Sequence, residues 1–160
     1  MSNPDKLNSP ARILGLKILG ECYSAGRFEA LEPLIDERCV FESQWVLEPR
    51  TGKAVVMEYL HGKGRALRKS GAFPWFELIE LVGDLALSPQ QDFLLNDEPV
   101  FGSFGLLYEA GKICLLMRQR VQDDIIDIVI DIQLNQLEKI IRIDLCMPEL
   151  FRYRPWSPKV

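Results

Sequence analysis

The sequence predicts an α+β domain: a curved antiparallel sheet with about three N-terminal helices packed on its concave side. Residues 125–147 contain two segments of alternating apolar and polar residues joined by a short polar turn, which is the pattern of a β-hairpin. Upstream of this hairpin, apolar residues recur at helical spacing in residues 10–25 and 52–69. Helices followed by a run of strands favour a sheet covered by helices on one side.

The first helix is predicted over residues 10–25, because Ser9 and Pro10 form a typical helix start and Gly26 a typical end. Its apolar face is expected to contain Leu7, Ala11, Leu14, Ile18 and Cys22. A short second helix follows from Phe28 to about Asp36, and Pro33 should bend or shorten it.

The rest of the chain reads as strands around one further helix. Alternation in residues 39–45 predicts the first strand, residues 48–50 a turn, and Thr51 the N-cap of a helix over 52–69. Further strands are expected at 75–87, 106–108 and 113–121, with a polar loop at 88–99, ahead of the hairpin.

The hairpin also predicts the two faces of the sheet. Isoleucines at even positions from Ile126 to Ile132 share one face, and Asp127 and Asp131 share the other. We therefore expect an apolar inner face and a polar outer face, on which Arg142 pairs with one of these aspartates across the hairpin.

Composition limits the classes of function. A length of 160 residues suits a single domain over residues 1–160, with a core at about 10–147 and a tail at 148–160 that lies over the surface or reaches a partner subunit. A net charge of −4 counts against nucleic-acid binding. The chain has no apolar run long enough for a membrane span and no signal-peptide pattern at its start, so we expect a cytoplasmic protein without membrane association.

The cysteines give no indication of a metal site or a cofactor. The four cysteines are Cys22, Cys39, Cys114 and Cys146. They are far apart, form no CxxC motif and have no histidine at ligand spacing, so none is expected to bind metal. Each lies within an apolar pattern, which predicts thiols packed as small hydrophobic side chains.

Several segments together resemble the NTF2-like superfamily, the cone-shaped α+β fold of steroid Δ-isomerases, scytalone dehydratase and SnoaL-like polyketide cyclases. The resemblance covers most of residues 10–147. It rests on the order and spacing of these segments: Ser24-Ala-Gly26, Asp36-Glu37-Arg-Cys-Val-Phe41-Glu, Glu48-Pro-Arg-Thr-Gly52, and the hairpin strands from Asp131 and from Glu138.

The resemblance implies a deep pocket on the concave side of the sheet. The position of the isomerase general base is matched by Ser43, that of the oxyanion-donating tyrosine by Leu19, and that of the protonated aspartic acid by Ile130. All three working groups are therefore missing, and isomerase chemistry by that machinery is not expected. The residues expected to line an apolar pocket are Leu19, Tyr23, Phe41, Ser43, Trp45, Tyr59, Met117, Ile130 and Met147, with Trp75 as a further aromatic candidate.

Other polar residues have simpler explanations than catalysis. His61 shares a helix face with Met57, Arg65 and Arg68, which predicts a more solvent-exposed than pocket-facing side chain. Lys63, Lys69 and these two arginines lie towards the helix C-terminus, where cations complement the helix dipole. Alternation directs Glu42 away from Ser43, so Glu42 is only the second choice for a catalytic base.

Two hypotheses about function remain open at this point. The first is a protein that binds a small hydrophobic ligand in an apolar pocket, forming a homodimer through the outer sheet face or the tail. The alternative is a lyase, isomerase or cyclase acting on a polyketide-like or aromatic substrate, with Tyr23, Ser43 or Glu42 in polar roles. A dimeric interaction module would use the same surfaces as the homodimer.

Overall fold

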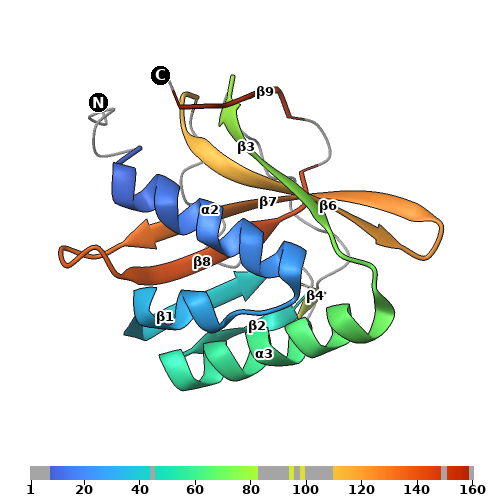
Figure 1. The fold of residues 1–160 in the computed structure, drawn as a ribbon, viewed down its shortest axis with the longest axis horizontal. Coiled ribbons are helices and arrows are strands. Elements are labelled where there is room, and N and C mark those ends of the chain that lie inside the picture. The colour runs from blue at the N-terminus through green and yellow to red at the C-terminus, as the bar shows by residue number, and fades with distance from the viewer. Residues whose placement is uncertain are drawn as a thin grey trace.

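The structure, a computed structural model, describes residues 8–43, 46–82, 94–95, 98–99, 110–148 and 151–158. Helices α2 (Pro10–Ala25) and α3 (Lys53–Ser70) and the 3-10 helix η1 (Glu29–Leu34) cover one face of a curved sheet (Figure 1). The strands of this sheet are β1 (Ile35–Ser43), β2 (Val46–Thr51), β3 (Trp75–Leu81), β6 (Ile113–Val121), β7 (Asp124–Leu134), β8 (Ile140–Cys146) and β9 (Tyr153–Pro155). The predicted α+β class is confirmed.

The strand order in the sheet is β2-β1-β8-β7-β6-β3-β9. The neighbouring strands are antiparallel except for β1 and β8, which are parallel. The predicted hairpin is confirmed as β7–β8, with Ile132 opposite Ile143 and Asp131 opposite Asp144. Two short strands, β4 (Leu94–Leu95) and β5 (Glu98–Pro99), pair with each other within the region predicted as a loop.

Helix α2 begins and ends as predicted, but its buried face is only partly the predicted one. The Ser9 side chain accepts a hydrogen bond from the Arg12 backbone N–H, and Gly26 ends the helix with a φ of 68°. Leu14, predicted on the buried face, is 54% exposed. Of the predicted face, Cys22 is buried, Ala11 and Ile18 are partly buried, and Leu7 lies outside the described residues. The buried positions are Arg12, Gly15, Leu16, Leu19, Gly20, Cys22 and Tyr23. The two glycines let the helix approach the sheet closely, because the Ile132 and Phe76 side chains occupy the space that a Cβ would fill.

The predicted turn at residues 48–50 is wrong, because these residues belong to strand β2. Phe41 pairs with Arg50 and Val40 with Thr51, so pairing with β1 outweighs the turn propensity of the sequence. Pro49 is tolerated because β2 is an edge strand. The N-cap of α3 is consequently Gly52 rather than Thr51.

Other boundaries differ modestly from the prediction. The second helix is the 3-10 helix η1, which contains Pro33, and β1 starts at Ile35 instead of Cys39. Strand β3 reaches Leu81, and the predicted strand positions beyond residue 82 and at 106–108 lie outside the described residues. The C-terminal tail adds strand β9 to the edge of the sheet beside β3.

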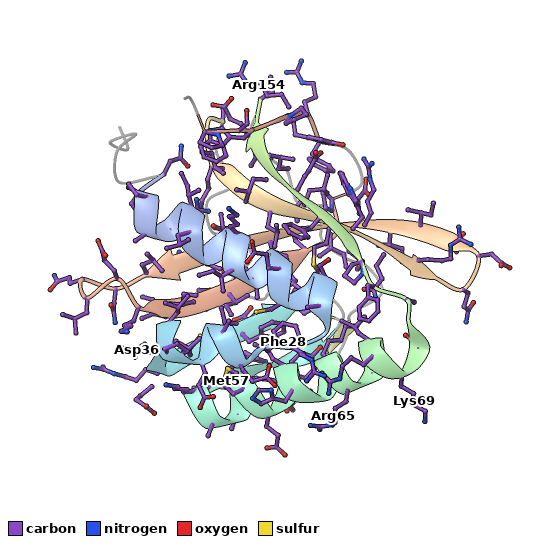
Figure 2. All side chains as sticks on the ribbon, viewed as in Figure 1. Phe28, Asp36, Met57, Arg65, Lys69 and Arg154 are labelled. Carbon is purple, nitrogen blue, oxygen red and sulfur yellow. The ribbon has the colours of Figure 1, made fainter. Side chains whose placement is uncertain are left out.

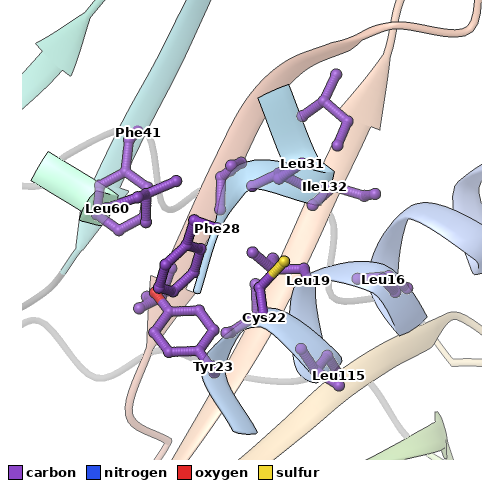
Figure 3. Close-up of a cluster of buried hydrophobic side chains, with 14 of the residues drawn as sticks. Leu16, Leu19, Cys22, Tyr23, Phe28, Leu31, Phe41, Leu60, Leu115 and Ile132 are labelled. Atoms are coloured by element: carbon purple, nitrogen blue, oxygen red, sulfur yellow. The ribbon is translucent and has the colours of Figure 1, made fainter. Parts of the chain in front are cut away.

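The sheet has a hydrophobic core on each face. The inner core lies under the helices and combines residues such as Leu19, Phe28 and Leu60 with the inner side chains of β1 and β6–β8 (Figure 3). The outer core consists of Ile79, Leu81, Cys114, Leu116, Val129 and Cys146, with Phe151 and Tyr153 of the tail packed against it. The prediction of a polar outer face is therefore wrong, because the chain covers part of that face itself.

Candidate ligand-binding site

The structure brings most of the predicted pocket residues together in the inner core. Leu19, Tyr23, Phe41, Met117 and Ile130 are buried members of this core, and Tyr59 and Met147 pack against it while remaining partly exposed. Ser43 is also buried, and its register opposite Leu145 places it on the same face as Phe41. Trp45 lies outside the described residues.

Aromatic rings from different elements meet in this core. The Tyr23 ring of α2 contacts the Phe28 ring edge-on, with 4.9 Å between centroids. The Phe41 ring of β1 lies 5.0 Å from the Tyr59 ring of α3. Figure 3 shows Tyr23, Phe28 and Phe41 converging between the helices and the sheet. We call these four side chains, Tyr23, Phe28, Phe41 and Tyr59, the aromatic wall. Each tyrosine adds a polar hydroxyl to it.

Arg50, which was not among the predicted site residues, lies beside this wall. It lies on β2 opposite Phe41, and its guanidinium carbon is 4.2 Å from the centroid of the Tyr59 ring. The Arg50 Nε is buried and has no hydrogen-bond partner among the described residues. Arg50 was not predicted as a site residue because residues 48–50 were predicted to form a turn. Only the short spacing between residue 43 and Val46 was a hairpin signal.

The tyrosine and serine hydroxyls supply hydrogen bonds rather than basicity. Burial, together with the neighbouring Tyr59, raises the pKa of Tyr23 far above its ordinary value. The Tyr23 hydroxyl therefore stays protonated at neutral pH. Ser43, Leu19 and Ile130, which the sequence resemblance matched to the isomerase working groups, are all buried. None of these three side chains exchanges a proton near pH 7.

Glu42 does not face the inner core. It is opposite Asp144 in the β1–β8 register, on the outer face, as alternation predicted. It is nonetheless only 8% exposed, and its Oε1 lies 2.8 Å from Nη2 of Arg142. This ion pair offsets the cost of burying the carboxylate.

The outer face holds a buried ionic cluster, which we define as Arg12, Lys112, Asp131, Arg142, Asp144 and Glu42. Asp131 forms ion pairs with Arg12 and Lys112. Arg12 also donates to the carbonyls of Ile113 (2.6 Å) and Ile132 (3.0 Å). These two residues lie just past the last β6–β7 pair, Leu115–Ile130, so Arg12 reaches from α2 between the ends of two strands.

The predicted ion pair between Arg142 and one of the hairpin aspartates is wrong. Arg142 lies opposite Gln133, and its Nε donates to Oδ2 of Asp144 at 2.9 Å. Asp127 instead pairs with Arg118 across β6–β7 at 2.9 Å. Cross-strand pairing of Asp127 on the outer face is thus confirmed, with a different partner.

Asp144 is the least compensated carboxylate of the ionic cluster. Its Oδ1 is buried without a hydrogen-bond partner among the described residues. Burial raises the pKa of Asp144 from 3.8 to about 6, and the charges of Asp131 and Glu42 add to this rise while Arg142 opposes it.

The remaining candidates have structural explanations. All four cysteines are buried thiols, as predicted, and burial raises the pKa of Cys22 to about 11 and that of Cys39 and Cys114 to about 12. These three thiols are therefore poor nucleophiles. Trp75 is 47% exposed, with the Arg118 guanidinium 5.1 Å from its ring, so its assignment to the pocket is wrong. Within the described part of the chain, no group of three or more His, Cys, Asp or Glu could hold a metal ion.

The polar residues of helix α3 lie mainly on the side of the helix that faces away from the inner core. Arg65 and Lys69 point away from the sheet (Figure 2), and His61 is partly buried. Met57, expected to mark an exposed face, is buried. Arg68 donates to the carbonyl of Gly26 and so also ties α3 to the end of α2. None of the described helices is long and apolar enough to cross a membrane.

Comparison with known proteins finds relatives by structure only. No family model and no curated protein matches the sequence. An NTF2-like protein of unknown function from Mesorhizobium loti has a TM-score of 0.55 at 12% identity, over 92% of this chain and 96% of that chain. The chain has the NTF2-like fold. A SnoaL-like protein of unknown function from Burkholderia thailandensis gives a TM-score of 0.51 at 11% identity, over 89% of this chain and 98% of that one.

A third neighbour of this NTF2-like chain is a steroid Δ-isomerase from Pseudomonas aeruginosa. Its TM-score is 0.50 at 15% identity, over 92% of this chain and 82% of that chain. At such identities the likeness concerns the fold alone. The function depends on the residues of the site.

Proposed function

We propose that this NTF2-like chain binds a small hydrophobic molecule between the inner sheet face and helices α2 and α3. The observation that carries the proposal is which side chains are found at the three positions that the sequence resemblance matches to isomerase working groups. They hold Ser43, Leu19 and Ile130, all buried. A site with these side chains offers apolar contact and a hydroxyl in place of a base and an acid.

The surroundings of these residues support the same function. Phe41 and Tyr59 present adjoining rings, and Tyr23 contributes a protonated hydroxyl from α2. Binding sites for small molecules are mostly apolar with a few placed polar groups. A steroid Δ-isomerase, whose name specifies a hydrophobic substrate, has a similar fold.

The proposal is tested with a neutral hydrophobic probe and a pair of matched variants. Native mass spectrometry of the purified protein first reports any small molecule that co-purifies with it. The fluorescent probe N-phenyl-1-naphthylamine is then titrated into wild type, Leu19→Phe and Leu14→Phe. Both leucines are on α2, but Leu19 is fully buried in the inner core and Leu14 is 54% exposed.

We expect saturable probe binding that Leu19→Phe weakens about tenfold, because the added ring atoms take up space in the site. Leu14→Phe should bind like wild type. Thermal unfolding confirms that both variants are folded. Absence of both probe binding and co-purifying mass, or equal affinities for wild type and Leu19→Phe, contradicts the proposal.

A further inference from the structure

Resting on the proposed function, we infer that the bound molecule carries an anionic oxygen group, and that Arg50 binds this group. The inference narrows the ligand to a hydrophobic acid, such as a carboxylic acid with an apolar body. It depends on the position of Arg50, on the partners of its guanidinium, and on the chemistry of its neighbours.

The position of Arg50 places a cation beside the aromatic wall. Strand β2 pairs with β1 so that Arg50 lies opposite Phe41, whose side chain is buried in the inner core. The Arg50 guanidinium covers the Tyr59 ring at 4.2 Å from its centroid, and Tyr59 in turn contacts Phe41. The charge thus borders the site proposed for the apolar part of the ligand.

Arg50 has no carboxylate partner among the described residues, unlike five other cations. Within the described residues, every ion pair involves another cation: Arg12, Lys112, Arg118, Arg142 or Arg154. The Arg50 Nε is hidden from solvent and has no hydrogen bond in the described part of the chain. Stacking on Tyr59 stabilises the charge but gives the Nε–H no acceptor. A bound anion would supply the hydrogen-bond acceptor and the opposite charge that this guanidinium lacks.

The shape of the guanidinium favours a carboxylate over a neutral polar group. Arginine presents parallel N–H donors that match the two oxygens of a carboxylate. The chain as a whole carries a net charge of −4, so its overall field does not attract anions. Preference for an acid would therefore come from Arg50 itself.

Two ligands of equal chain length test the inference. Decanoate and decanol share an apolar chain and differ in their head group, and each is used to displace N-phenyl-1-naphthylamine at concentrations below self-association. The proteins are wild type, Arg50→Met, Arg50→Lys and Arg154→Met. Methionine keeps much of the apolar stem of arginine, and Arg154 is an exposed arginine on β9.

We expect decanoate to displace the probe from wild type at about tenfold lower concentration than decanol. Arg50→Met should abolish this preference, so that decanoate and decanol displace the probe from this variant at similar concentrations. Arg50→Lys should retain part of the preference, and Arg154→Met all of it. Raising the ionic strength should weaken the binding of decanoate to wild type and leave the binding of decanol unchanged.

The failures of the two proposals are distinguishable. If the neutral probe does not bind wild type, the proposed function itself fails. If the probe binds but decanol competes as well as decanoate, only the anionic ligand is contradicted. If folded Arg50→Met weakens both competitors equally, Arg50 contributes packing alone and the inference is overturned.

Discussion

At the scale of single residues, the ionic cluster on the outer face shows how buried charges are compensated. Three cations, Arg12, Lys112 and Arg142, accompany three carboxylates, Asp131, Asp144 and Glu42. The pairs offset much of the cost of removing charge from water. Compensation is incomplete at Asp144, because its Oδ1 has no hydrogen-bond partner in the described residues and Asp131 lies directly opposite in the register.

Asp144 should make the stability of the protein depend on pH. Its pKa is about 6 in the folded state, against 3.8 ordinarily, so the folded state holds a proton that the unfolded state releases between these values. The stabilisation by this proton is complete below about pH 4 and is lost as pH rises through 6. Two pKa units correspond to about 3 kcal/mol. We expect the unfolding free energy of wild type, relative to Asp144→Asn, to fall by about 2 to 3 kcal/mol from pH 4 to pH 7.

Urea unfolding at a series of pH values measures this difference. Asp127→Asn is the matched control, because Asp127 pairs with Arg118 on the same face while both side chains remain partly exposed. The control should follow the pH dependence of wild type. Parallel curves for wild type and Asp144→Asn would show that Asp144 titrates alike in the folded and unfolded states.

At the scale of elements, the contact between α2 and α3 depends on glycine. A Cβ on Gly64 of α3 would lie 2.6 Å from the carbonyl oxygen of Gly26, the residue that ends α2. Such a contact with backbone is relieved only by moving one helix. By contrast, a Cβ on Gly62 would meet its nearest neighbour, the Arg65 side chain, at 3.6 Å.

The two glycines of α3 should therefore respond oppositely to alanine. Gly64→Ala is expected to lower the unfolding free energy by about 1 to 3 kcal/mol, because the added methyl group forces the helices apart. Gly62→Ala should raise it by about 0.5 to 1 kcal/mol through helix propensity. Chemical denaturation of both variants measures the contrast. A stabilised Gly64→Ala would mean that the helices can separate at little cost.

The sequence predicted elements better than it predicted contacts. Caps and alternation located α2 and the β7–β8 hairpin, because both signals are local. The buried face of α2 was predicted only in part, since Gly15 and Gly20 carry no hydrophobic signal although they let the helix approach the sheet. Arg50 was missed because pairing with β1, a tertiary interaction, overrides the turn propensity of Glu48 and Pro49.

At the scale of the whole molecule, the sheet is covered on both faces. Helices cover the inner core, and the tail contributes Phe151 and Tyr153 to the outer core. The Tyr153 hydroxyl also accepts a hydrogen bond from Arg118 at 2.8 Å. Residues such as Leu116 and Val129 are thereby fully buried within one chain. A homodimer stays a prediction, but burial of these residues does not require a partner.

Removal of the tail tests this arrangement. Deleting residues 149–160 removes β9, which pairs with β3. It also removes the hydrogen bond that the Trp156 N–H donates to the Leu78 carbonyl at 3.0 Å. Loss of three partly buried aromatic side chains should lower the unfolding free energy by about 2 to 4 kcal/mol. It also leaves β3 as an unprotected edge beside uncovered apolar surface, so the shortened chain should self-associate.

Deleting only residues 157–160 removes no part of β9 and should change neither stability nor self-association. Urea unfolding and light scattering after gel filtration measure both, and a monomeric truncation as stable as wild type would show that the outer core does not depend on the tail.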